Sequence, residues 1–322
     1  MHNDLIIKPA IEVKNLEKVY LAKDKKKIQK TALRGINLTI NQGEIFGLLG
    51  PNGAGKSTFI NILAGLVIKS KGEVNINGFN LDTNVREARQ SIGVVPQELT
   101  LDPFFSPEDS LELQAGMYGV RKKNRKTKEI LSALKLNDVA KGYARRMSGG
   151  MKRRLMVGKA MVHSPPILVL DEPTAGVDVE LRKDMWKVVD GLRKTGVTII
   201  LTTHYIEEAE AIADRVAVIN QGEIIVVDNK IDLLKKMGHK KLTIELQDKI
   251  EKLPAKLNEY NLIISEDKYS LIYNYNLNEE RTGITKMLQD LKNVGLRMRD
   301  LKTEQNNLEK IFVTLVRENN EI

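Results

Sequence analysis

The chain has 322 residues, of which 42% are hydrophobic and 29% are charged, so it can bury one large core or two modest ones, and disorder is excluded as its main state. It has no cysteine, which excludes disulfides, a thiol nucleophile and a thiolate metal site and fits a reducing compartment. The net charge of +9 belongs to residues 1–239, because residues 240–322 hold 14 basic and 14 acidic residues. This excess suits a phosphate-bearing ligand, an anionic membrane surface or nucleic acid.

Short apolar runs alternate with helical patterns between residues 36 and 227, which is typical of a mainly parallel sheet covered by helices. Turn residues at 41–43 and 220–222 predict hairpin-like antiparallel pieces at the margins of this sheet. The fold class indicated is therefore α/β. The strands expected in its core are 45–49, 92–95, 167–170, 197–202, 216–219 and 223–227.

No apolar run approaches the ~20 residues that a helix needs to span a bilayer. The start of the chain also lacks the basic residues and the long apolar stretch of a signal peptide. We therefore expect a protein that is soluble by itself, so that any passage across a membrane requires a separate protein.

Two regions depart from the alternating pattern. Residues 99–146 show helical patterns only and contain a basic run at 121–128, so they predict a helical insertion. After residue 239 the pattern restarts, and we expect a first domain over 1–239 and a small α+β unit over 240–322. The elements expected in the second unit are strands at 242–246 and 269–273, a helix near 282–291 and a closing helix at 304–316.

Residues 50–58 read Gly-Pro-Asn-Gly-Ala-Gly-Lys-Ser-Thr, between an expected strand and an expected helix at 59–65. Glycines let the backbone curl so that successive N–H groups and a helix N-terminus face phosphate oxygens, while Lys56 supplies a charge and Ser57 a hydroxyl for magnesium. A chance glycine-rich turn is the alternative, but the pattern arises by chance in roughly one sequence in a hundred. The segment therefore predicts a P-loop that binds a nucleotide.

Three other expected strands end in residues that suit phosphate chemistry. After one strand, Asp171 can hold a magnesium shell and Glu172 can take a proton from an attacking water. His204 ends a second strand, and Gln97 ends a third and can reach the same magnesium or water. Alone, such carboxylates are usually solvated and such a histidine structural. Because ligands of open α/β sheets bind beyond the carboxyl ends of the strands, we expect these side chains to converge on the P-loop.

Ser148, Gly149 and Gly150 precede a mostly apolar helical stretch that runs to residue 162. Ser148 can cap this helix and, with the glycine amides, present a second anion-binding N-terminus. By itself the segment would be interpreted as an ordinary helix cap. Its position in the chain between the other motifs makes it informative about function, because the order of these motifs can be compared with known families.

Taken in order over residues 10–235, these segments closely resemble the nucleotide-binding subunit of an ATP-binding cassette (ABC) transporter. The resemblance implies a P-loop ABC cassette, with a mainly parallel sheet, an antiparallel margin and a helical insertion, followed by the small C-terminal unit. The matching motifs are the P-loop at 50–58, the Q-loop at Gln97, the signature at 147–151, Walker B at 167–172, the D-loop around Asp178 and the H-loop at His204. Tyr20 resembles the A-loop aromatic that stacks on adenine, although a surface strand tyrosine is the alternative, and 23–30 is expected to be an exposed loop.

The resemblance implies an ATPase that uses ATP and Mg²⁺. Glu172 would be the general base, His204 would position water and the γ-phosphate, and Gln97 and Lys56 complete the expected catalytic set. Ser57, Gln97 and Asp171 are the expected magnesium ligands. The residues expected to contact ATP are Tyr20, Gly50, Pro51, Asn52, Gly53, Ala54, Gly55, Lys56, Ser57, Thr58, Ser148, Gly149 and Gly150.

The signature departs from the usual Leu-Ser-Gly-Gly-Gln, because Met147 and Met151 flank Ser-Gly-Gly here. Only Ser148, Gly149 and Gly150 therefore carry over as phosphate contacts, and a role for the final glutamine is absent. The run at 148–154, the Walker B extension at 171–178 and the C-terminal unit are similar to ATPases of ABC-2-type exporters, which move drugs, lipids or polysaccharides.

Residues 229–232 (Asn-Lys-Ile-Asp) mimic the guanine-reading motif of GTPases. However, the strand end downstream of the P-loop reads Asp-Glu-Pro-Thr instead of Asp-x-x-Gly, and Ser-Gly-Gly has no role in GTPases. We therefore expect selectivity for ATP.

In the family, two cassettes bind head to tail with ATP between the P-loop of one and the Ser-Gly-Gly of the other. We therefore expect a dimer, with a homodimer favoured, that closes on the γ-phosphate and opens on hydrolysis. Gln97 would link the ATP site to a separate membrane permease. Phe104, Phe105 and the helix at 111–118 are candidates for the docking surface, with ordinary core packing as the equal alternative.

The resemblance places the protein in the cytoplasm, peripheral on the inner face of the cell membrane. The alternative function is a soluble ABC ATPase that acts on ribosomes or nucleic acid, for which the basic run at 121–128 could contact phosphates. We expect no nucleic-acid partner, because the chain has one motif set, no sustained heptads and no aromatics interleaved in that run. A regulatory nucleotide-binding module is a third possibility, but it would need negligible hydrolysis despite Glu172.

Overall fold

The computed structural model describes residues 9–21, 30–174, 179–237, 239–276, 283–305, 312–313 and 317. The D-loop region around Asp178, most of the expected loop at 23–30 and most of the expected closing helix lie outside the described residues. The chain divides into two compact units, residues 1–228 and 229–322. Helix α8 falls in the second unit, whereas the sequence analysis begins that unit at residue 240.

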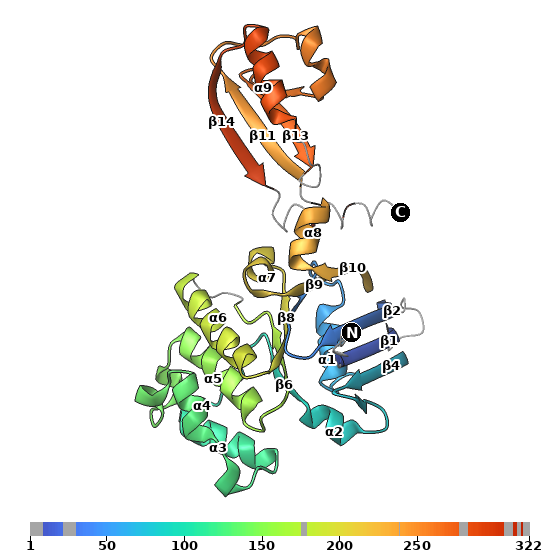
Figure 1. Cartoon of the computed structure of the whole chain (residues 1–322). Helices are drawn as coiled ribbons and strands as arrows, with labels where there is room; N and C mark the ends of the chain where they lie inside the picture. The colour runs from blue at the N-terminus through green and yellow to red at the C-terminus, as the bar shows by residue number, and fades with distance from the viewer. Residues whose placement is uncertain are drawn as a thin grey trace, which may run out of the picture. The chain divides into compact units, whose positions relative to one another are not determined.

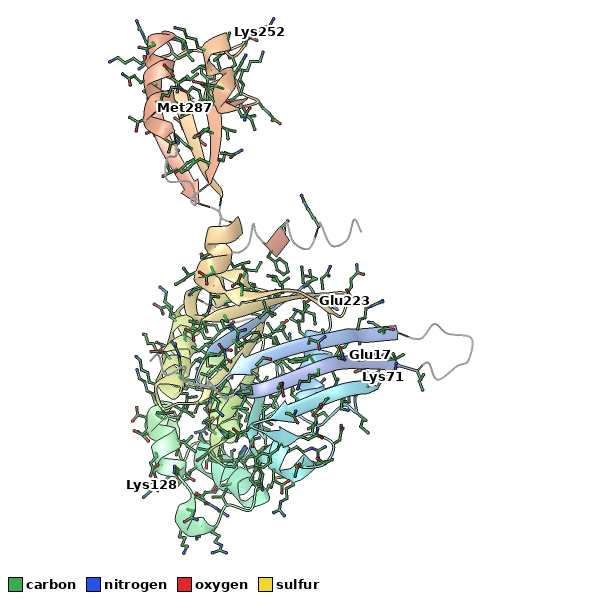
Figure 2. All side chains as sticks on the ribbon, turned by 45° about the vertical axis from the view of Figure 1, so that its right-hand side comes forward. Glu17, Lys71, Lys128, Glu223, Lys252 and Met287 are labelled. Carbon is green, nitrogen blue, oxygen red and sulfur yellow. The ribbon has the colours of Figure 1, made fainter. Side chains whose placement is uncertain are left out.

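An antiparallel sheet opens the first unit, and its strands are paired in the order β2-β1-β4-β5. In β2 the side chains of Ile36, Leu38 and Ile40 are buried while Asn37 and Thr39 are exposed, as expected of a sheet with one wet face. An ion pair between Glu17 and Lys71, 3.3 Å apart, joins paired positions of β1 and β4 (Figure 2). The strands are β1 (Pro9–Tyr20), β2 (Lys30–Asn41), β4 (Lys71–Ile76) and β5 (Phe79–Asn80).

A six-stranded sheet follows in the order β10-β9-β3-β8-β7-β6. Its central strand β3 pairs in parallel with β8 and β9, and all five β3 residues are buried because both faces of the sheet are covered. All the expected core strands are confirmed to within about two residues. They are β3 (Ile45–Leu49), β6 (Ile92–Val95), β7 (Ile167–Asp171), β8 (Thr198–Thr203), β9 (Arg215–Asn220) and β10 (Glu223–Asn229).

The two expected marginal turns differ in outcome. The turn at Gln221 and Gly222 joins the neighbouring strands β9 and β10, and both residues have positive φ (47° and 85°), as in tight hairpins. The expectation of a hairpin at 41–43 is wrong, because β2 belongs to the antiparallel sheet and β3 to the parallel one. The chain therefore crosses between sheets there.

Helices flank the parallel sheet, and residues 99–146 form helices without a strand, as expected (Figure 1). Helix α3 begins with a strong cap, since the Ser106 hydroxyl accepts from the Asp109 N–H at 3.0 Å and Pro107 follows the cap. The helices are α1 (Lys56–Leu63), α2 (Val85–Gln90), α3 (Pro107–Met117), α4 (Thr127–Ala133), α5 (Gly149–Met161), α6 (Val179–Lys194) and α7 (Ile206–Ile212), with 3-10 turns at Lys122–Asn124, Asn137–Val139 and Ala144–Arg146.

One hydrophobic core joins the two sheets of the first unit. Ile11 and Leu33 from the antiparallel sheet, Phe46 and Ile200 from the parallel sheet and Phe59 from α1 belong to one buried cluster. Each such side chain contributes about 1.5–3 kcal/mol by leaving water. The core thus fixes α1, and with it the P-loop, against both sheets. No helix in the described part of the chain is both long and apolar enough to cross a bilayer.

The second unit has its own antiparallel sheet, in the order β12-β13-β11-β14, and its own core, which includes Ile244, Leu271 and Met287 (Figure 2). The expected closing helix is wrong at its start, because residue Glu304 lies in β14 and is paired with Lys241. Pairing with the edge of β11 thus outweighs a local helical pattern. The elements are α8 (Lys230–Met237), β11 (His239–Leu246), η4 (Ala255–Tyr260), β12 (Ile263–Ile264), β13 (Ser270–Asn276), α9 (Ile284–Asn293) and β14 (Met298–Gln305).

Candidate active site

The P-loop connects the end of β3 to α1 and packs closely against its neighbours. A Cβ added at Gly50 would lie 2.4 Å from the carbonyl oxygen of Ile219, and Gly55 adopts a φ of 116° that favours glycine. Gly55 is the N-cap of α1, and no side chain caps the helix. The first N–H groups of α1 are therefore not taken by a side chain, as a phosphate-binding N-terminus requires.

The close contact at Gly50 predicts a stability effect. Gly50→Ala is expected to lower the free energy of unfolding by about 1–3 kcal/mol, because the new methyl group overlaps backbone instead of a flexible side chain. Denaturant unfolding measures this change. Gly149→Ala is the matched control, since a Cβ there meets nothing within 4 Å. Equal unfolding midpoints for the two variants would contradict the packing described for Gly50.

Lys56 is the first residue of α1 and is only 5% exposed. Its Nζ donates to the carbonyl oxygens of Gly50 (2.7 Å) and Pro51 (3.2 Å) and lies 3.8 Å from Oε1 of Glu172. Burial lowers the pKa of Lys56, while the carboxylates of Glu172 and Asp171 act in the opposite direction. A buried cation held by neutral carbonyls beside a glycine-rich loop is well placed to receive an anionic phosphate.

The Glu172 side chain is contacted by side chains that follow two other strands, β6 and β8. Its Oε2 accepts a hydrogen bond from Nε2 of Gln97 at 3.0 Å and lies 3.2 Å from Nδ1 of His204. The backbone of Glu172 has a φ of 45°, which a non-glycine residue adopts only when its surroundings hold it. The Glu172 N–H donates to both the carbonyl oxygen and the hydroxyl of Thr202, each at 3.1 Å. The expected convergence of Gln97, Glu172 and His204 is therefore present.

Asp171 is held from the neighbouring strand β8. Its Oδ1 accepts from the hydroxyl of Thr202 at 2.6 Å, and burial raises the pKa of Asp171, with Glu172 adding to the increase. Thr202 thus supports the carboxylate of Asp171 and the backbone of Glu172. Sequence reasoning missed this role because a threonine within a strand carries no sign of it.

The donors of Ser57, Gln97 and Asp171 suit Mg²⁺. Hydroxyl, amide and carboxylate oxygens are hard ligands, and Mg²⁺ usually takes its remaining ligands from phosphates and water. The described residues contain no cluster of three or more His, Cys, Asp or Glu side chains that could hold a metal alone. The donor set therefore fits a magnesium ion that arrives with a nucleotide.

A pocket of about 530 Å³ lies over these residues, a size that suits a nucleotide. Tyr20 from β1 contributes to the wall and is 39% exposed, with Nζ of Lys18 4.8 Å from its ring centroid. The expected site residues Gly50, Pro51, Ala54 and Asp171 do not line the pocket. The lining residues are Tyr20, Lys30, Ala32, Asn52, Gly53, Gly55, Lys56, Ser57, Thr58, Gln97, Glu172 and His204.

The signature segment does not line this pocket. Ser148 is the N-cap of α5, and its hydroxyl accepts from the Met151 N–H at 3.3 Å. Ser148 and Gly149 are exposed, whereas Gly150 is buried. The N-terminus of α1 therefore belongs to the pocket, and the N-terminus of α5 does not.

Arg153, further along α5, is a second residue that the sequence analysis missed. It is 4% exposed, and its Nη1 donates to the carbonyl oxygens of Pro96 (3.2 Å) and Gln97 (2.7 Å). Burial lowers the pKa of this guanidinium. The signature helix is therefore bonded directly to the backbone of the residue that contacts Glu172.

A P-loop at the centre of a parallel sheet, two carboxylates at the end of β7, a histidine after β8 and a helical insertion that precedes Ser-Gly-Gly define an ATP-binding cassette ATPase. The family model described as ABC transporter matches residues 33–175. The chain belongs to the ABC transporter family.

Two curated relatives match almost the whole chain. The linearmycin resistance ATP-binding protein LnrL of Bacillus subtilis (strain 168) is 32% identical over 95% of this chain and 97% of its own length. The daunorubicin resistance ATP-binding protein DrrA2 of Streptomyces coeruleorubidus is 31% identical over 91% and 93%. A solved dimeric ATP-binding cassette in a post-hydrolysis state with ADP and Pi matches with a TM-score of 0.59 and 27% identity, over 68% of this chain and 98% of that one.

Proposed function

We propose that this chain is the ATP-binding and hydrolysing subunit of an ABC-2-type exporter and that it energises export through a separate membrane permease. The observation that carries the proposal is the group formed by Lys56, Glu172, His204 and Gln97 at one phosphate pocket. Similarity over nearly the full length to two resistance ATP-binding proteins supports the exporter class. It extends beyond the 68% of the chain that matches the compact cassette.

In this proposal the chain's own groups perform hydrolysis. Lys56 and the N–H groups of α1 bind the phosphates, and Tyr20 stacks on the adenine. Oε1 or Oε2 of Glu172 takes a proton from a water whose oxygen attacks the γ-phosphorus, and the bond to the β–γ bridging oxygen breaks to release ADP. Gln97 and His204 hold Glu172 in the orientation that this step needs. Ser57, Asp171 and Gln97 would hold Mg²⁺, which when bound offsets the negative charge of the phosphates.

A second cassette completes the site, with a homodimer as the simplest assembly. Ser148 and Gly149 are exposed at the start of α5 and lie outside the pocket of their own chain. In the dimer, the Ser148 and Gly149 of each chain can therefore contact the γ-phosphate in the pocket of the other chain. The γ-phosphate would then bridge the two chains, and its loss would release them. The dimeric form of the similar solved cassette supports this arrangement.

The permease would dock on the helical insertion, which places the subunit in the cytoplasm at the inner face of the membrane. Phe104 (68% exposed) and Met117 (75%) are exposed, so for them core packing is ruled out, whereas Leu111 is buried and is ordinary core. A hollow of about 540 Å³ lies beside Tyr118. Its lining combines apolar side chains with two arginines and consists of Ala64, Leu66, Val85, Arg86, Arg89, Gln90, Ile92, Val94 and Tyr118.

A negative charge on the exposed surface formed by Phe104 and Met117 is expected to weaken the permease complex. Phe104→Glu and Met117→Glu should each reduce recovery of the permease at least about tenfold, because a carboxylate loses hydration on entering an apolar interface. The measurement is co-purification in detergent with a candidate permease, chosen as a membrane protein encoded next to this chain. Lys128→Glu is the control, since it introduces the same carboxylate in the same insertion at an exposed position that is already charged (Figure 2). Undiminished recovery with both variants would exclude this surface.

The nucleic-acid alternative has less support from the structure. Within the basic run, Arg125 forms an ion pair with Glu112 at 2.6 Å and also donates to the carbonyl oxygen of Val120. Salt-sensitive binding of RNA or DNA would revive this alternative. A regulatory module is distinguished by the absence of ATP turnover. Comparison of ATP with GTP tests nucleotide choice, and none of the residues 229–232 lines the pocket.

A further inference from the structure

Glu208 is a carboxylate of helix α7 that the proposed mechanism does not use. Its side chain is 1% exposed, so it has lost nearly all contact with water. A buried carboxylate is retained only where other groups replace the lost hydration. The groups that do so here come from three separate segments, and two of them adjoin the catalytic residues.

Two threonine hydroxyls donate to Glu208, one to each carboxylate oxygen. Thr174 donates to Oε1, and Thr203 donates to Oε2 at 2.9 Å. Both threonines are 1% exposed, so water does not compete for these bonds. The third partner is Arg182 of α6, whose Nε lies 3.3 Å from Oε1 and whose guanidinium lies 5.2 Å from the ring centroid of Tyr205.

Thr203 controls the turn that carries His204. Its hydroxyl oxygen accepts a hydrogen bond from the N–H of Tyr205 at 2.9 Å. This bond joins the residues directly before and after His204 and so restrains the turn that carries it. The same hydroxyl gives its proton to Glu208, which fixes the direction of the acceptor lone pairs. The ring of Tyr205 in turn lies 4.0 Å from the ring of His204, centroid to centroid.

Thr174 controls the other side of the catalytic pair. It follows Glu172 by two residues, and Pro173 between them has a fixed φ, so an anchored Thr174 restricts the backbone of Glu172. Glu172 needs such restraint because it has a positive φ. One buried carboxylate therefore holds the segments of both partners in the 3.2 Å contact between Oε2 of Glu172 and Nδ1 of His204.

We propose that Glu208 is a positioning residue for ATP hydrolysis, which fixes Glu172 and His204 relative to each other through Thr174 and Thr203. The inference rests on the roles proposed above for Glu172 and His204. Glu208 itself does not line the pocket, so it acts on the chemical step through these neighbours and not on ATP binding.

The test uses the full chain and measures kcat and KM for ATP below the unfolding temperature of every variant. Glu208→Gln keeps the shape but loses the charge, and it should lower kcat on the order of tenfold or more while KM stays within about twofold. Thr203→Val removes the hydroxyl and should act in the same direction. Thr203→Ser keeps a hydroxyl and is the matched control, which should retain kcat within about twofold.

A mutant cycle separates positioning from general support of the fold. In a His204→Ala background, Glu208→Gln should lower the remaining kcat by a clearly smaller factor than in the wild-type chain, because one of the two side chains that it positions has already been removed. A full additional loss in that background would overturn the inference, as would an unchanged kcat for both Glu208→Gln and Thr203→Val. If Glu172→Gln and His204→Ala themselves retain turnover, the proposed catalytic roles fail first, and the positioning role fails with them.

Discussion

Glu172→Gln is expected to lower kcat for ATP hydrolysis by about 10²–10⁴-fold, the usual contribution of general acid–base catalysis. The amide has the size of the carboxylate but cannot accept the proton from water. Gln97 and His204 keep a partner at position 172, so the pocket keeps its shape. The substitution removes a negative charge that lies 3.8 Å from Nζ of Lys56 and partly neutralises it. The lysine then attracts the phosphates more strongly, so ATP binding should persist or strengthen.

The variant should also trap the ATP-bound dimer. Because the γ-phosphate joins the two cassettes in the proposed function, a chain that binds ATP and cannot cleave it should migrate as a dimer with Mg-ATP and as a monomer without it. Turnover and sizing by gel filtration measure the two effects. Glu223→Gln is a control, since Glu223 is an exposed glutamate away from the pocket (Figure 2). Full turnover would remove Glu172 as the base. A persistent monomer at saturating Mg-ATP, with no permease able to restore pairing, would refute the dimer proposal.

Gly149→Asp should abolish hydrolysis without damage to the fold. Gly149 is the first residue of α5, and a Cβ there meets nothing within 4 Å. An aspartate in the first turn stabilises a helix by about 0.3–1 kcal/mol, so the unfolding temperature should stay the same or rise. In the proposed dimer, however, its negative charge faces the γ-phosphate of the other chain. We therefore expect turnover to fall by at least about 10²-fold and the affinity of the monomer for ATP to stay unchanged.

Mixing two inactive variants tests whether Gly149 acts on the other chain. Lys56→Ala removes the P-loop cation but leaves the signature intact, and Gly149→Asp does the reverse. A head-to-tail heterodimer of the two contains one intact site, so the mixture should recover part of the activity that each variant lacks. Absence of recovery would contradict the head-to-tail arrangement. Lost ATP binding by the Gly149→Asp monomer would contradict the separation of the signature from its own pocket.

The elements predicted best are those specified by contiguous residues. The strand that precedes the P-loop and the strand that precedes Asp171 are buried on both faces, so their uninterrupted apolar runs mark them clearly. Strands β1 and β14 were not predicted. In β14 only Leu301 interrupts the five charged or polar residues that lie between Met298 and Gln305, and pairing with β11 makes this segment a strand. The hairpin expected at 41–43 failed because β2 pairs with β1, which precedes it, whereas β3 pairs with β8 and β9 much later in the chain.

The sequence by itself determined the phosphate chemistry of this protein. The P-loop and the polar residues at strand ends are set by local backbone rules, and the parallel order of the strands then brings those ends to one edge of the sheet. Only the tertiary structure decided how these residues are held. Thr202 joins the Asp171 carboxylate to the backbone N–H of Glu172, Arg153 bonds to the backbone of Gln97, and Glu208 joins the segments of Glu172 and His204. Each of these contacts links residues at least five and mostly more than thirty positions apart, and such a pairing depends on the packing of helices and strands that no local pattern encodes.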